Sequence, residues 1–111
     1  METRPAIAAL AALAQESRLA VFRLLVETGP EGLAASKIAA ALGLPASSLS
    51  FHLKELSHAG LIAARQDGRF IIYAAQFETM NGLVAFLTAN CCGGNPCTQA
   101  GTPSCATTQS C

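Results

Sequence analysis

Apolar residues recur at helical spacing along most of the first 89 residues. Leucine, isoleucine, valine and alanine fall three or four positions apart, which places them on one side of an α-helix. This spacing predicts helices over residues 5–15, 18–27, 37–42, 48–59 and 77–89. The residues expected to cap the second, third and fourth of these helices at their starts are Ser17, Ser36 and Ser47. The third and fourth helices are expected to end at Gly43 and Gly60.

The spacing changes after the fourth helix. Residues 61–65 and 69–74 are β-prone runs, and Gln66-Asp67-Gly68 between them is typical of a hairpin turn. A hairpin alone is not stable in water, so these strands are expected to lie against the helices. Four helices, two strands and a last helix predict a mainly α fold with a β-hairpin wing, which is a winged helix-turn-helix.

The helix over residues 48–59 is the expected DNA-reading helix. Leu49, Leu53 and Leu56 form a narrow stripe that is expected to pack inward. The opposite face carries serines, a lysine and a phenylalanine, with no acidic residue in its first two turns, which favours a DNA groove. The DNA contacts predicted from this face and from the hairpin are Ser47, Ser48, Ser50, Phe51, Lys54, Arg65 and Arg69.

Several of these residues have a structural alternative. Phe51 either contacts a thymine methyl group or packs on a neighbouring helix. His52, on the flank of the leucine stripe, is expected to be half-buried and structural rather than a DNA contact. Arg65 and Arg69 flank the expected turn and are either ordinary surface residues, with Asp67 cancelling charge between them, or contacts to DNA. After a helix-turn-helix, the DNA contact is the favoured interpretation.

Composition restricts the class of protein. The 111 residues form one domain, and seven basic residues balance seven acidic ones, which excludes a uniformly polycationic nucleic-acid binder but not a local basic patch. Residues 5–14 are apolar, but the preceding Met-Glu-Thr-Arg has no positive excess, which disfavours a signal peptide. No run approaches the roughly 18 apolar residues of a membrane span. We expect a cytoplasmic protein without a membrane partner, and no catalytic pattern indicates an enzyme.

Two segments carry a family resemblance. Residues 48–62, SLSFHLKELSHAGLI, with RQDGRFIIY at 65–73, closely resemble the ArsR/SmtB family of bacterial metal-responsive repressors, and ALAQESRLAVFRLL at 12–25 matches the same family. The resemblance spans about residues 5–89. It implies a homodimer that binds double-stranded operator DNA upstream of resistance genes and is released by a metal or metalloid ion. The implied dimer interface uses the first and last helices, here Ile7, Leu10, Leu13, Met80, Leu83, Val84 and Leu87.

All five cysteines fall in residues 90–111, a segment without charged or large apolar side chains. Such a segment cannot build a core, so we expect a DNA-binding and dimerisation domain over residues 1–89 and a flexible cysteine-rich tail over 90–111. Clustered thiols in a reducing cytoplasm indicate metal ligands or a redox sensor. A redox-sensing regulator of the same fold is the alternative, although this tail lacks the positive charge that lowers a thiol pKa.

The inducer sites of the family can be compared with this chain. Residues 33–37 lack the Cys-x-Cys of the founding arsenic site, and residues 77–89 lack the Asp and His of the zinc-type site. Some arsenic-responsive members carry a vicinal cysteine pair and a third cysteine after the last helix, which here implies Cys91, Cys92 and Cys97. Three thiolates select a soft ion, so trivalent arsenic or antimony is the expected inducer, with no organic cofactor. Cys105 and Cys111 are spare ligands, a second weak site, or without a role.

Overall fold

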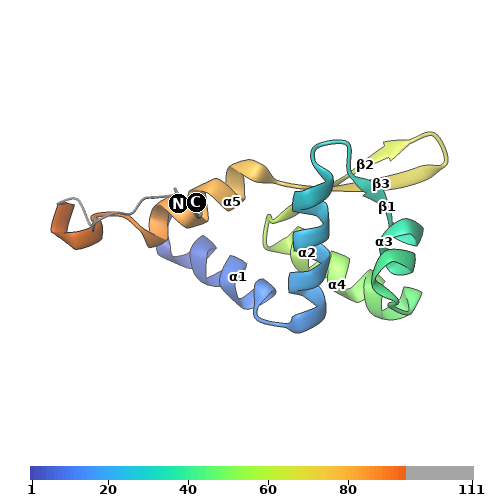
Figure 1. Cartoon of the computed structure of the whole chain (residues 1–111), viewed down its shortest axis with the longest axis horizontal. Helices are drawn as coiled ribbons and strands as arrows, with labels where there is room; N and C mark the ends of the chain where they lie inside the picture. Colours follow the sequence, from blue (N-terminus) through green and yellow to red (C-terminus); the bar gives the residue numbers. More distant parts are fainter. Residues whose placement is uncertain (95–111) are drawn as a thin grey trace.

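The computed structural model describes residues 1–94, and the predicted winged helix-turn-helix, mainly helical with a β wing, is confirmed. The wing extends from one end of the molecule, whereas α1 and α5 lie side by side at the other end (Figure 1). The cysteine-rich tail predicted for residues 90–111 lies outside the described residues from 95 onward. In chain order the elements are α1 (Thr3–Leu13), α2 (Glu16–Thr28), β1 (Leu33–Ala34), α3 (Ala35–Leu42), α4 (Ala46–His58), β2 (Ile62–Asp67), β3 (Phe70–Ala75), α5 (Phe77–Leu87) and a short 3-10 segment, η1 (Cys91–Gly94).

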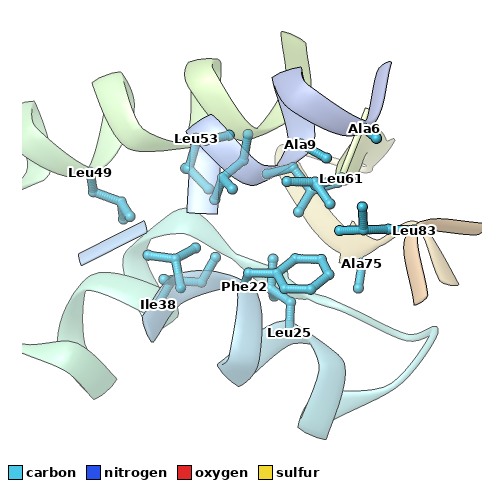
Figure 2. Close-up of a cluster of buried hydrophobic side chains, with 14 residues drawn as sticks. Ala6, Ala9, Phe22, Leu25, Ile38, Leu49, Leu53, Leu61, Ala75 and Leu83 are labelled. Carbon is cyan, nitrogen blue, oxygen red and sulfur yellow. The ribbon is translucent and has the colours of Figure 1, made fainter. Parts of the chain in front are cut away.

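The core is made of aliphatic side chains and one phenylalanine, contributed by every helix. The leucine stripe of α4 faces inward as predicted, and Figure 2 shows Leu49 and Leu53 across from Ile38 of α3 and Phe22 of α2. The face that α1 buries consists of small residues, Ala6, Ala9 and Ala12. Alanines let α1 pack closely against α2 and α4, and burial of this apolar surface holds the reading helix in place.

The three serines predicted as N-caps lie inside the first turns of their helices, so that prediction was wrong for Ser17, Ser36 and Ser47. The helix α2 is capped by Gln15, whose side-chain oxygen accepts a hydrogen bond from the Arg18 backbone N–H at 2.9 Å. Ala34 and Pro45 precede α3 and α4 without a side-chain cap. Pro45 is extended, with a ψ of 146°, so the helix begins at the next residue and Ser47 is already helical.

The sheet has a third strand that the residue pattern did not predict. β1 pairs antiparallel with β3, so the strand order is β1-β3-β2. It has two residues, which is too short for an alternating pattern to be recognised. The hairpin turn also lies later than predicted: Asp67 pairs with Phe70, so Gly68 and Arg69 form the turn. The extra strand attaches the wing to the start of α3.

Gly32 precedes β1 and has a φ of +70°, a conformation that L side chains rarely adopt. A Cβ at this position would overlap the carbonyl oxygen of Tyr73 and lie 2.9 Å from Cγ2 of Ile72. Gly32→Ala is therefore expected to lower the free energy of unfolding by about 3 kcal/mol, because backbone strain and overlap add. Gly43, at a φ of +65° with open space around it, is the matched control. Gly43→Ala is expected to lower the free energy of unfolding by only about 1 kcal/mol, measured by urea denaturation. Equal losses in the two variants would show that overlap with Tyr73 and Ile72 does not add to the cost of Gly32→Ala.

Candidate nucleic-acid interface and cysteine pair

The outward face of α4 carries the predicted contact residues. Ser47, Ser48, Ser50, Phe51 and Lys54 are all exposed, on the side of the helix away from the buried leucines. Their exposure is confirmed, and their contacts with DNA remain predictions. Hydroxyl and ammonium groups on one helix face are the groups that donate hydrogen bonds to phosphates and base edges.

Phe51 is 56% exposed, so the alternative in which it packs on a neighbouring helix is wrong. Its ring meets the ring of His52 edge to face, with centroids 5.9 Å apart and planes at 63°. His52 is half-buried, as predicted, and its Nδ1 atom is buried without a hydrogen-bond partner among the described residues. The imidazole is thus partly withdrawn from solvent beside Phe51, whereas the Phe51 ring is mostly exposed.

Arg65 connects the wing to a distant loop. Its Nη2 donates a hydrogen bond to the carbonyl oxygen of Glu31 at 2.7 Å, and its Nη1 donates to that of Pro30 at 3.4 Å. The prediction that Arg65 and Arg69 flank the turn was wrong, because Arg65 lies within β2 and Arg69 lies in the turn itself. Arg69 is thus at the tip of the wing, whereas Arg65 is positioned to orient the wing relative to α2.

The predicted dimer-interface residues divide into two groups. Ile7 and Leu10 on α1, with Val84 and Leu87 on α5, are exposed, and these two helices lie side by side (Figure 1). The other three are buried or half-buried in the protomer's own core, namely Leu13, Met80 and Leu83. We define the four exposed residues as the terminal apolar surface.

Two of the predicted inducer ligands, Cys91 and Cys92, begin η1, and three residues separate them from the end of α5. The Cys91 backbone N–H donates to the carbonyl oxygen of Thr88 at 3.1 Å, so η1 continues from the end of the helix. Asn90 and Cys92 both have positive φ values, 55° and 57°, and this curls the chain. The two sulfur atoms lie 3.9 Å apart, and both residues are exposed. A zinc–thiolate bond is about 2.3 Å long, so sulfurs within ~4.6 Å of each other can share one ion of this size.

The third predicted ligand, Cys97, lies outside the described residues, as do Cys105 and Cys111. Within residues 1–94 there is no group of three His, Cys, Asp or Glu side chains that could hold a metal ion. Cys91 is a free thiol, whereas Cys92 is disulfide-bonded in this structure. A thiolate site that includes Cys92 therefore requires reducing conditions.

Known proteins share this architecture. A family model described as a helix-turn-helix domain matches residues 13–65. The HTH-type transcriptional regulator YgaV of Escherichia coli (strain K12) is 33% identical over 82 residues, which are 74% of this chain and 81% of that protein. An ArsR-like transcriptional regulator from Rhodococcus sp. RHA1 has a TM-score of 0.68 at 27% identity, with 76% of each chain covered. The chain belongs to the ArsR-like family of helix-turn-helix transcriptional regulators.

Two further structures resemble this ArsR-like regulator. A protein described as a possible transcriptional regulator for arsenical resistance is 30% identical, with a TM-score of 0.63 over 73% of this chain and 81% of that one. The homodimeric winged helix-turn-helix domain of Mb0332 from Mycobacterium bovis shares the fold at 24% identity, with a TM-score of 0.64 over 86% and 89% of the chains. In residues 1–94 of the ArsR-like regulator, every helix is too short or too polar to cross a bilayer.

In this ArsR-like regulator, Lys54 and Arg69, which are expected to contact phosphates, should respond to substitution differently from Arg65, which holds the wing. Lys54→Ala and Arg69→Ala are expected to weaken DNA binding and to reduce the slope of log affinity against log salt by about 0.9 for each phosphate that is no longer neutralised. Arg65→Ala should weaken binding about fivefold, because the wing is no longer held in position, and leave the slope unchanged. Fluorescence anisotropy at several salt concentrations measures both. A reduced slope for Arg65→Ala would instead make Arg65 a phosphate contact.

Proposed function

We propose that this chain is a homodimeric repressor of a metalloid-resistance operon, released from operator DNA when trivalent arsenic or antimony binds the thiolates of Cys91, Cys92 and Cys97. The observation that carries the proposal is the position of the cysteine pair. Two sulfurs lie 3.9 Å apart, four and five residues after the end of α5, the helix that presents Val84 and Leu87 on its exposed side. A ligand held there would act on a helix of the expected dimer interface.

The terminal apolar surface supports the homodimer. Four large apolar side chains are exposed on two adjacent helices, α1 and α5. Their burial against a second copy of the chain would be favourable, because it removes apolar surface from water. A two-fold dimer would present two α4 helices to successive major grooves of a palindromic operator. The resemblance to the homodimeric domain from Mycobacterium bovis is in accord with this assembly.

The donor set supports a soft metalloid rather than zinc. The exposed residues around the pair, from Thr88 to Gly93, include no histidine or carboxylate, so only sulfur is offered as a strong ligand. Thiolates alone favour thiophilic ions. The resemblance to a possible regulator for arsenical resistance points in the same direction. A coupling of about 1–3 kcal/mol between ligand and DNA is typical of such linkage.

A thiol-redox regulator is the second candidate function, favoured by the disulfide at Cys92. The two candidates differ in what releases the DNA. The experiment is a panel of arsenite, antimonite, zinc, cadmium and hydrogen peroxide added to the protein–DNA complex in a buffer that keeps thiols reduced, with a peroxide arm lacking the reductant. The metalloid proposal expects release by arsenite and antimonite at concentrations where zinc has no effect. Release by peroxide alone would instead support the redox regulator.

A further inference from the structure

Phe51, on the exposed side of α4, differs in polarity from its neighbours on the helix surface. Four residues at spacings of four, three and four follow one another along the exposed side of α4: Ser47, Phe51, Lys54 and His58. Residues at these spacings are neighbours on a helix surface. We define these four residues as the reading stripe. Three of them carry polar groups, whereas Phe51 places an apolar ring in the stripe at 56% exposure.

Phe51 also lies at the centre of the outward face. It follows Leu49 by two residues, so at about 100° per residue it lies ~200° around the helix from that buried leucine. The contact of its ring with the ring of His52, with centroids 5.9 Å apart, restricts its orientation, because His52 is itself half-buried. An exposed aromatic ring that is already oriented loses little conformational freedom when it binds.

The major groove offers this ring one suitable partner. Base edges there present hydrogen-bond donors and acceptors, which a phenyl ring cannot use, and one apolar group, the C5-methyl of thymine. We propose that Phe51 is a specificity-determining residue that recognises the methyl group of one thymine in each half of the operator. The inference rests on the proposed insertion of α4 into the major groove. It assigns Ser47 and Lys54 to hydrogen bonds and Phe51 to the distinction between thymine and cytosine.

The test uses a duplex selected by the wild-type protein from a randomised DNA library. Each thymine of the selected duplex is replaced in turn by deoxyuridine, which removes only the methyl group and keeps the base pair. Affinity is measured by fluorescence anisotropy. At one position in each half-site, the replacement is expected to weaken wild-type binding about fourfold, and about fifteenfold when both half-sites are changed.

Phe51→Ala should bind the unmodified duplex more weakly and should not distinguish thymine from deoxyuridine beyond about twofold. Phe51→Leu, which keeps an apolar group, should retain part of the discrimination. Phe70, 61% exposed on β3, is the matched control, and Phe70→Ala should keep the full deoxyuridine effect. Because Phe51 is exposed, its variants should show the thermal unfolding of the wild type.

The outcomes separate this inference from the proposed function. If the wild type selects no specific duplex, the DNA-binding proposal fails. If it selects a duplex without thymine in the half-sites, or one in which deoxyuridine has no effect at any position, the role of Phe51 is overturned while the repressor proposal stands. A deoxyuridine effect that persists in Phe51→Ala also overturns it, because another residue must then read the methyl group.

Discussion

Replacing Cys91 or Cys92 with serine is expected to leave DNA affinity unchanged and to raise the arsenite concentration needed for release at least about a hundredfold. Serine keeps the shape of the side chain but not the soft sulfur ligand, and two thiolates cannot complete a three-sulfur site. DNA affinity should persist because both cysteines are exposed and lie beyond α5, at the end of the molecule away from the wing. Anisotropy of the DNA complex, titrated with arsenite in reducing buffer, measures both quantities.

Variants of the remaining cysteines serve as controls for this result. Cys97→Ser is expected to behave like the other two ligand variants. Truncation after Cys97, which removes Cys105 and Cys111, is expected to keep both DNA binding and release by arsenite. Loss of the response in the truncated chain would show that one of the removed cysteines is a ligand, and the assignment of Cys97 would have to be revised.

The second large effect is expected at the terminal apolar surface. Leu10→Glu should convert the dimer to a monomer at micromolar concentration, because two carboxylates would otherwise be buried in an apolar interface. DNA affinity should then fall at least about a hundredfold, since each protomer would bind its half-site without the effective concentration that a linked partner supplies. Sedimentation velocity gives the oligomeric state, and anisotropy gives the affinity.

Leu19 provides a matched control for this substitution. It is 43% exposed, compared with 42% for Leu10, but it lies on α2, outside the terminal apolar surface. Leu19→Glu should leave the dimer and its DNA affinity intact. A Leu10→Glu protein that remains dimeric would refute the proposed interface, and equal dissociation by both variants would show that the interface extends to α2.

Features that depend on periodicity could be predicted from the sequence. Leu49, Leu53 and Leu56 recur at helical spacing, so the buried and exposed faces of α4 followed directly. Helix starts were less predictable, because capping depends on backbone angles as well as residue type. Pro45 begins α4 earlier than a serine cap would, and a glutamine side chain caps α2. The strand β1 is defined by its pairing with β3, which no local pattern contains.

In the candidate site too, features that depend on local pattern could be predicted from the sequence, and features that depend on distant contacts could not. The cysteine-rich segment was predicted from composition and stays a prediction from residue 95 onward, whereas helical spacing correctly predicted that Phe51 and Lys54 are exposed. The role of Arg65 could not be read in this way, because its acceptors, the carbonyl oxygens of Pro30 and Glu31, are 35 and 34 residues away in the chain. Contacts at such separations exist only after the wing has packed beside the loop that follows α2.

The measurement that tests the central claim most directly is a stoichiometric arsenite titration of the reduced, full-length protein bound to its selected duplex, followed by fluorescence anisotropy. One arsenite per protomer, held by three thiolates, should release the DNA, so the signal should fall and level off at one equivalent. DNA that stays bound well beyond one equivalent of arsenite, but is released when the thiols are oxidised, would contradict the account.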